Sequence, residues 1–487
     1  MHLSKSRFVA GLQCHRQLWW RVHEPKAPEL EVDPELQAIF DQGHAVGAKA
    51  REHFPGGVLV DALHHDFAGR LEQTRRALDS GAPSIFEAAF TAGDVFVAVD
   101  VLERTPRGFT VVEVKSSTSV KDEHVPDAAI QAYVLRHAGL PVERVEVMHL
   151  NRECRFPDLS NLFIRQDVTD AAAALCAEAP HIVAAQLEAL RGDLPDVATG
   201  DHCSSPRECP FLARCWPPGP DHHVRTLYYI GKRAAELEAR GFVTIHDLPE
   251  DVKLSRIASR QRCAVRENRI IVEPGLRGAL ASISRPFAVL DFETVGLAIP
   301  AWNGCRPYDQ VPAQFSCHLV RGHADPVHHA WIADSSDDPR PALAARLIEA
   351  CRGAASVVAY NSSFEAKALR HLAEFVPSHA AELLNIEKRL IDALPIVRDH
   401  VYHPAFGGSF SLKSVLPALV PTMSYQDLDV AGGQLASVEL ARLMFEGHAM
   451  GHADRDRLRE SLRSYCALDT LGVVRLLDRL DVLAARA

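Results

Sequence analysis

Three polar side chains on a candidate β-hairpin are of the types that phosphodiester cleavage requires. The run FVAVDVLERTPRGFTVVEVKS (96–116) predicts two strands joined by a turn at 105–108, with proline and glycine where a type I turn favours them. A two-residue loop places Asp100 directly across from Glu113, and Lys115 on the same face. Two carboxylates can hold a divalent cation, and an amine can steady the developing charge. A bulge at the turn glycine would slip this register, and a surface cluster of charges is the alternative interpretation.

A second acidic set is spread over the last 200 or so residues. The apolar strand in RPFAVLDFETVG ends in Asp291 and Glu293, and a spacing of two puts both carboxylates on one face, with the residue between them toward the core. Glu365 falls in the first turn of a helix that an Asn or Ser of NSSFE can cap, and the last helix carries Tyr465 and Asp469 at i, i+4. Such carboxylates would repel one another without cations, which favours two-metal phosphoryl transfer over four ordinary surface residues.

Four cysteines form a third candidate set. Cys203, Cys209 and Cys215 recur at equal intervals in HCSSPRECPFLARCW, and Cys14 lies alone near the start. Eleven cysteines in a long chain without a secretory signal favour reduced thiols or a metal site over disulfides. Thiolates at short intervals suit an iron–sulfur cluster, and zinc would also fit. Buried or incidental thiols are the alternative.

The elements around these residues predict an α/β multidomain protein. A chain of 487 residues exceeds what one core usually organises. We expect a nuclease-type domain over 1–220, a helical linker over 221–283 and a domain of alternating strands and helices over 284–487. No segment reaches membrane-spanning length and no signal peptide is evident, so we expect a cytoplasmic protein without a membrane partner.

Local basic surface is the condition for binding nucleic acid, because the net charge is −10. Residues 225–270 hold ten Lys or Arg against six Asp or Glu. Within them, YIGKRAAELEARGFVTIHDLP resembles a helix–hairpin–helix element, which grips phosphates without reading sequence; Lys232 and Arg233 are its candidate contacts. A plain helical spacer is the alternative.

The hairpin motif VDVLE…VVEVKSST resembles the PD-(D/E)xK nuclease core, specifically its RecB-like branch. The resemblance implies metal ligation by the two hairpin carboxylates and a catalytic Lys115. It also implies an upstream acidic residue, for which Glu87 is the candidate, and a downstream Gln and Tyr on a helix, Gln131 and Tyr133. Those two are separated by two positions rather than the family's four, so their side chains diverge and Gln131 is the stronger candidate.

The order of one cysteine before the nuclease core and three after it is similar to that of the RecB-like iron–sulfur nucleases, including the CRISPR-associated and AddB-type members. The resemblance implies a cluster, 4Fe-4S in type, that staples the ends of the domain. The equal spacing departs from the family pattern and leaves the cluster type open.

The motifs DFET, NSSFE and YCALD resemble those of DEDDy exonucleases of the DnaQ-like group, which cut 3′→5′ on a ribonuclease H fold. The resemblance implies that Asp291, Glu293, Glu365 and Asp469 bind metal and that Tyr465 orients the attacking water. Glu365 stands where Asp is usual. Asp392 is a possible auxiliary carboxylate.

Together these resemblances predict a metal-dependent nuclease with two sites, using Mg²⁺ or Mn²⁺ and acting on DNA in repair, recombination or defence. The chain resembles bacterial proteins that fuse a RecB-like iron–sulfur domain to a DnaQ-like domain. A nucleic-acid-binding scaffold with one or both sites inactive, and an RNA-processing nuclease, are the alternatives.

Overall fold

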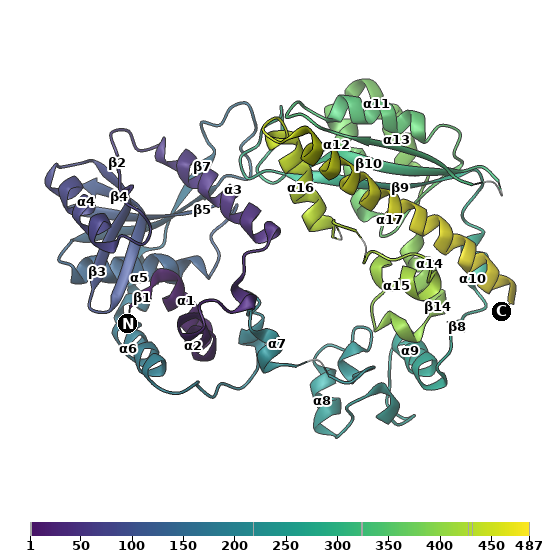
Figure 1. Ribbon diagram of the computed structural model, residues 1–487, viewed down its shortest axis with the longest axis horizontal. Helices are drawn as coiled ribbons and strands as arrows, with labels where there is room; N and C mark the ends of the chain where they lie inside the picture. The colour runs from purple at the N-terminus through teal and green to yellow at the C-terminus, as the bar shows by residue number, and fades with distance from the viewer. Residues whose placement is uncertain (1, 218, 323–324, 427, 431, 487) are drawn as a thin grey trace. The chain divides into compact units, whose positions relative to one another are not determined.

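The chain folds into two compact units, each with its own β-sheet (Figure 1). The computed structural model describes residues 2–217, 219–322, 325–426, 428–430 and 432–486. Unit 1 comprises Met1–Pro218 and Leu297–Asp309, and unit 2 comprises Gly219–Gly296 and Gln310–Ala487. The helical segment expected as a separate linker therefore belongs to unit 2, and a loop of the C-terminal region belongs to unit 1. The architecture is mixed α/β, as the sequence predicts.

Unit 1 is built on a seven-stranded sheet in the order β2-β3-β4-β5-β6-β7, with β1 added beside β4. Its strands are β1 (Leu3–Ser4), β2 (Val58–Leu59), β3 (Ser84–Ala92), β4 (Val95–Thr105), β5 (Gly108–Lys115), β6 (Val142–Leu150) and β7 (Phe163–Asp167). Its helices are α1 (Lys5–Gln13), α2 (His15–His23), α3 (Pro34–Arg51), α4 (Phe67–Asp79), α5 (His124–His137), α6 (Thr169–Arg191) and α7 (Leu212–Cys215).

The β4–β5 hairpin has the register that a two-residue loop dictates. Thr105 pairs with Gly108, and the ladder continues without a bulge to Val101 opposite Val112. The next two residues are Asp100 and Glu113. Val95, Val97 and Val99 of β4 lie in the main core of unit 1, whereas Val101 packs in a second cluster, and the half-buried Asp100 lies between Val99 and Val101.

Helix α5 packs across the sheet and is buried along almost its whole length. Ile130, Val134 and Leu135 pack against the valines of β4 and β5, while Ala128 and Ala132 face β6 and α6. This burial fixes the helix against the C-terminal end of β5. Polar residues in its first two turns are thereby held beside the hairpin carboxylates.

Unit 2 contains a five-stranded sheet in the order β11-β10-β9-β12-β13 and a small two-stranded sheet of β8 and β14. Its strands are β8 (Ile271–Val272), β9 (Phe287–Gly296), β10 (Gln310–Val320), β11 (Val327–Ile332), β12 (Ser356–Ala359), β13 (Leu390–Asp392) and β14 (Val401–Tyr402). Its helices are α8 (Arg233–Ala239), α9 (Arg256–Glu267), α10 (Leu276–Leu280), α11 (Arg340–Ala350), α12 (Ser363–Phe375), α13 (Ala380–Lys388), α14 (Ala393–His400), α15 (Leu412–Leu419), α16 (Gly433–Glu446) and α17 (His452–Arg486).

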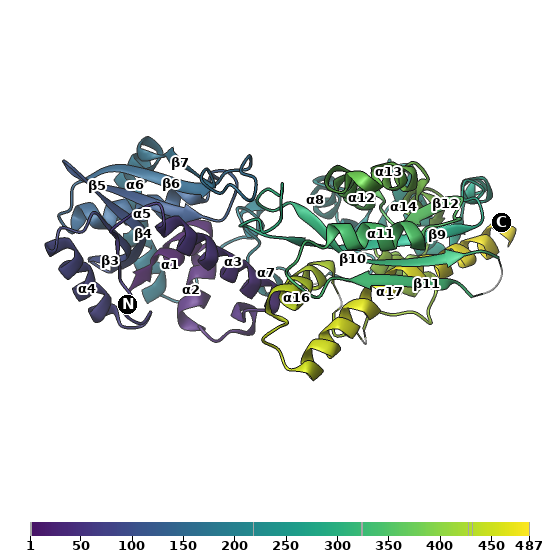
Figure 2. The ribbon, with the colours of Figure 1, turned by 90° about the horizontal axis from the view of Figure 1, so that it is seen from above.

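The alternation of side chains along β9 separates a core face from a polar face. Leu290 and Phe292 pack with helices α11, α12 and α13 in the main core of unit 2, as expected for the residue between the two acids. Asp291 and Glu293 point to the opposite face, which α16 and α17 cover (Figure 2). Among the described residues, no helix is both long and apolar enough to cross a bilayer.

Candidate functional sites

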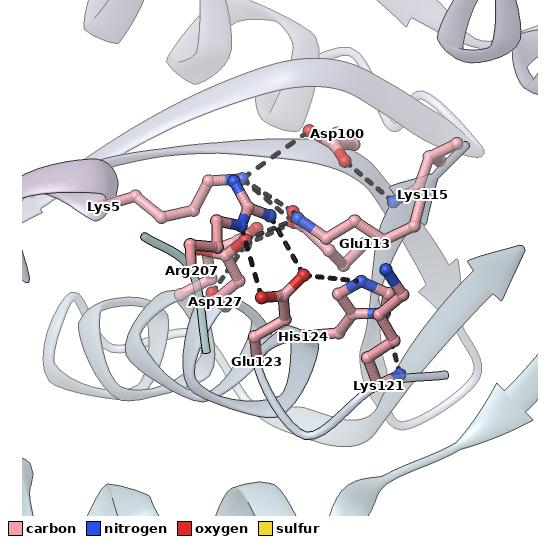
Figure 3. Close-up of polar contacts among 11 residues, drawn as sticks. Lys5, Asp100, Glu113, Lys115, Lys121, Glu123, His124, Asp127 and Arg207 are labelled. Carbon is pink, nitrogen blue, oxygen red and sulfur yellow. Dashed lines mark hydrogen bonds and ion pairs between the residues drawn. The ribbon is translucent and has the colours of Figure 1, made fainter. Parts of the chain in front are cut away.

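The unit 1 site brings the hairpin carboxylates together with two lysines and a glutamine. Glu113, 1 % exposed, accepts from Lys5 Nζ at 2.8 Å and from Gln131 Nε2 at 2.5 Å. Lys115 Nζ lies 2.7 Å from Glu113 Oε1 (Figure 3). Asp100 accepts the backbone N–H of Val114 at 2.7 Å, which ties it to the opposite strand.

The two carboxyls of this site have opposite electrostatic behaviour. Burial and the neighbouring Glu113 raise the pKa of Asp100 to about 7. Burial acts in the same direction on Glu113, but Lys5 and Lys115 outweigh it and hold the pKa of Glu113 below its usual value. Lys115 has its own pKa raised to about 12, because Glu113 and Asp127 overcome the effect of burial. The two lysines therefore form ion pairs with Glu113 and Asp127, whereas the environment of Asp100 favours its protonated form.

Asp127 completes this set from the first turn of α5. Its Oδ2 accepts from Lys115 Nζ at 2.5 Å, and its backbone carbonyl accepts from Gln131 Nε2 at 2.8 Å. Gln131 Oε1 is buried, and among the described residues no donor reaches it. Because Nε2 is the atom that contacts Glu113, Oε1 is on the other arm of the same amide and remains a buried acceptor without a donor among the described residues.

The remaining residues implied by the PD-(D/E)xK resemblance differ in their positions. Glu87 lies beside Asp100, because the residue before it, Phe86 of β3, pairs with Val101 of β4. The charge of Glu87 contributes to the raised pKa of Asp100. Arg70 forms an ion pair with Glu87 at 3.4 Å. Tyr133 instead packs against the hydrophobic core and stacks near His137, away from Gln131. The divergence expected from their spacing is therefore observed.

The four cysteines surround one small pocket in unit 1. Cys14, Cys203, Cys209 and Cys215 line it together with Trp20 and neighbouring residues, and all four are free thiols. Among the described residues, no three of these sulfurs lie within 4.8 Å of one another. Four free thiols around one pocket suit either an iron–sulfur cluster or zinc.

The unit 2 site gathers carboxyls from three separate elements. Asp291 and Glu293 come from β9, Glu365 from the first turn of α12, and Asp469 from α17. Burial, followed by Asp469, Glu293 and Glu365, raises the pKa of Asp291 well above its usual value. The same kinds of cause raise the pKa of Glu293 strongly. Each of these acids thus lies within the field of the others.

The other two carboxyls of this site are also destabilised as anions. Burial raises the pKa of Glu365 to about 7, with Asp392 adding to it, and burial raises the pKa of Asp469 to about 6. Glu365 Oε2 is buried, and no hydrogen-bond donor among the described residues reaches it. These carboxyls offer more oxygen atoms than the surrounding residues satisfy, and such oxygens are the ligands that hard divalent cations prefer. Asp392 caps α14 by accepting from Leu394 N at 2.9 Å, so its first role is structural.

Asp291 and Glu293 also form a compact group with Cys466, in which one potential ligand atom from each lies within 4.8 Å of the others. Burial and the surrounding acids raise the pKa of Cys466, so it is protonated and lies 3.3 Å from Asp291 Oδ2 as a donor. The carboxyls remain the groups that could hold a hard cation.

Two tyrosines and a lysine border the carboxyls. Tyr425 donates its hydroxyl to Asp469 Oδ1 at 2.5 Å, and its ring centroid lies 6.4 Å from that of Tyr465. Lys413 Nζ lies 5.7 Å from the Tyr465 ring centroid, and its charge favours the anionic forms of Glu293 and Asp469. Tyr465 therefore lies at the acidic cluster, together with a second tyrosine that sequence reasoning did not identify.

The basic segment of unit 2 carries less free positive charge than its composition suggests. Many of its arginines are paired within the segment or nearby: Arg225 with Glu238, Arg260 with Glu273, Arg262 and Arg266 with Glu250, and Arg269 with Glu267. Lys232 is the N-cap of α8, and Arg233 donates to the carbonyl of Lys253 at 2.9 Å. After Gly241 the chain forms a short 3-10 turn, Ile245–Asp247, rather than the second long helix of the expected hairpin.

Sequence reasoning missed four residues of the two sites: Lys5, Asp127, Tyr425 and Lys413. Asp127 had a local signal, because it precedes Gln131 by one helical turn. Lys5 is 108 residues from Glu113 and had none. Tyr425 lies outside any helix or strand, where no periodic pattern indicates its direction.

Comparison with known proteins gives a match to part of the chain. Residues 288–411 match the model of a domain of unknown function, DUF2779. The chain is similar to an uncharacterised protein of Ureaplasma parvum serovar 3, with 23 % identity over 233 residues. The match covers 43 % of this chain and 33 % of that protein, so the chain spans about a third of the relative.

Proposed function

We propose that this protein is a metal-dependent nuclease with two sites. Unit 1 would act as a RecB-like PD-(D/E)xK nuclease, and unit 2 as a DnaQ-like 3′→5′ exonuclease on a ribonuclease H-like fold. The substrate we propose is DNA, in repair, recombination or defence. The observation that carries the proposal is the convergence of Asp291, Glu293 and Asp469 from distant motifs, with raised pKa values that a cation would reverse.

The residues of unit 2 fit the roles that this chemistry needs. Asp291, Glu293, Glu365 and Asp469 would hold Mg²⁺ or Mn²⁺, which would activate water and neutralise the charge on a phosphodiester. Tyr425 holds Asp469 by its hydrogen bond. Tyr465 would orient the attacking water, and Lys413 would offset the negative charge of the cluster.

The residues of unit 1 fit a separate cation site. Asp100 and Glu113 would hold the cation, and Gln131 would position Glu113 by donating from its Nε2. Lys115 would stabilise the phosphate charge that develops on cleavage, while Asp127 fixes its position. The cysteine pocket would hold a 4Fe-4S cluster on Cys14, Cys203, Cys209 and Cys215, with zinc as the alternative.

The test is cleavage by the full-length protein. End-labelled single- and double-stranded DNA and RNA are incubated with Mg²⁺, with Mn²⁺ and with a chelator. We expect DNA cleavage in the metal lanes only, with single-nucleotide trimming from 3′ ends. Cleavage of RNA alone would indicate an RNA-processing nuclease, and binding without cleavage in every lane would indicate a scaffold.

A further inference from the structure

The unit 1 site already contains a cation of the protein's own. Lys5 Nζ donates to both oxygens of Glu113, at 2.8 Å and 3.1 Å, and lies 3.9 Å from Asp100 Oδ1 (Figure 3). The ammonium therefore contacts the same two carboxyls that would bind a divalent cation. Lys5 on both oxygens of Glu113, Lys115 on Oε1 and Gln131 on Oε2 together take up the roughly four lone-pair positions of this carboxylate, so a divalent cation has to displace one of these donors.

We propose that Lys5 is a built-in competitor of the divalent cation in unit 1. Its ammonium holds Glu113 and Asp100 together when the cation is absent and has to leave them when the cation binds. Lys5 thereby sets the affinity of the site. This inference rests on the proposed function, because it assumes that these carboxyls take a metal.

Lys5, rather than Lys115, is the lysine that a divalent cation would displace, because Lys115 has a second acidic partner. Lys115 retains Asp127 as a partner at 2.5 Å when Glu113 turns to a metal. Among the described residues, the ion pairs of Lys5 are with Glu113 and Asp100 only. A divalent cation on those two groups therefore removes both partners of Lys5.

The backbone holds Lys5 in place from both sides. Leu3 of β1 pairs in parallel with Val95 of β4, and Ser4 caps α1 through the N–H of Arg7. At the far end of α1, Gln13 Nε2 donates to the carbonyls of His202 and Arg207 at 2.7 Å each. Lys5 thus starts from a fixed helix whose last turn leads to the cysteine pocket, and only its side chain needs to move.

The experiment measures Mn²⁺ binding directly, by the electron paramagnetic resonance signal of free Mn²⁺. It uses the full chain carrying Asp291→Asn and Glu293→Gln, which silence unit 2. In this background Lys5→Met should bind Mn²⁺ about tenfold more tightly, the change that about 1.4 kcal/mol of lost competition produces. Lys5→Gln should also tighten binding. Lys5→Arg, which keeps the charge, should tighten it much less.

Two controls make the result interpretable. Lys26→Met removes an exposed lysine of the same unit and should leave Mn²⁺ binding unchanged. Glu113→Gln should abolish it. If Glu113→Gln removes Mn²⁺ binding but neither neutral Lys5 variant tightens it, the competitor inference is wrong and the metal site stands. If no variant shows binding that depends on Glu113, both the inference and the unit 1 part of the proposed function are wrong.

Discussion

The two acidic sites differ in how their charge is balanced. In unit 1, Glu113 has Lys5, Lys115 and Gln131 within hydrogen-bond distance, and its pKa lies below the usual value. In unit 2 the pKa values of all four carboxyls are raised. Unit 1 places two lysines on Glu113, whereas in unit 2 the pKa values of all four carboxyls stay raised although Lys413 lies near them, so protons or ions from solution have to balance their charge. The unit 2 site should therefore depend more strongly on added metal.

The largest expected effect concerns the chemical independence of the two sites. Asp291→Ala should reduce 3′ trimming by about 10²-fold or more while the unit 1 activity persists, and Lys115→Ala should do the reverse, because neither site takes a residue from the other. Product lengths on a sequencing gel distinguish the two activities. If either single variant removed all cleavage, one of the two folds would be a substrate-holding domain.

The next effect concerns the cysteine pocket. Anaerobically purified protein should be brown, with broad absorbance near about 400 nm from thiolate-bound iron and sulfide. Cys209→Ala should bleach this absorbance and lower the melting temperature, because Cys209 lines the same pocket as Cys14, the C-cap residue of α1. Cys263→Ala, outside the pocket, is the matched control. A colourless native protein with stoichiometric zinc would overturn the cluster assignment.

A smaller effect distinguishes the two sites by how the thermal stability of the protein depends on pH and Mg²⁺. The raised pKa values of Glu365, about 7, and Asp469, about 6, mean that the folded protein holds protons there that the unfolded chain releases near pH 4. Their contribution to stability is thus present at low pH and is lost as pH rises to about 7. Mg²⁺ should restore it, so the rise in melting temperature on adding Mg²⁺ should be larger at pH 8 than at pH 5.

Ligand linkage sets the size of this rise. A cation at 100 times its Kd contributes about 2.7 kcal/mol, and each kcal/mol corresponds to about 2–4 °C in a domain of this size. Asp291→Asn with Glu293→Gln should remove most of the Mg²⁺ effect, whereas Asp100→Asn should remove little of it. An equal loss from both variants would contradict the proposed difference between the sites.

The smallest effect concerns the tyrosines of unit 2. Tyr465→Phe keeps every carboxyl and should slow trimming by about 10-fold, less than Asp291→Ala, since it removes only a water-orienting hydroxyl. Tyr425→Phe removes the hydrogen bond to Asp469 and is the comparison variant. Single-turnover rates over a pH series measure both. A Tyr465→Phe rate equal to the native rate would remove this tyrosine from the reaction.

Local patterns sufficed to predict the parts of both sites that lie within one element. The register of the hairpin, as far as Val101 opposite Val112 and so one residue short of Asp100 and Glu113, followed from the loop length, because a short turn fixes the register of its strands. The shared face of Asp291 and Glu293 followed from strand alternation. Helical spacing likewise separated Gln131, which contacts Glu113, from Tyr133, which packs in the core.

Features that depend on distant contacts could not be predicted. Lys5 reaches Glu113 because a two-residue strand, Leu3–Ser4, pairs beside β4, and nothing in its own sequence indicates that partner. The positive charge of 225–270 was overestimated because counting residues ignores pairs such as Arg225 with Glu238. The division into units was also hidden, since the loop Leu297–Asp309 belongs to unit 1 although both strands beside it belong to unit 2.

The loop Leu297–Asp309 determines whether the two units can be produced as separate fragments. Ala298 packs with Val46 and Leu150 of unit 1, and the carbonyl of Cys305 accepts from the backbone N–H of Phe156 at 3.0 Å. A fragment that begins after unit 1 would carry the loop without these partners and would expose its apolar side chains to aggregation. Limited proteolysis within the loop should instead leave both halves associated with their cores. Inactivating substitutions in the full chain, rather than truncations, are therefore the means of assigning an activity to each unit.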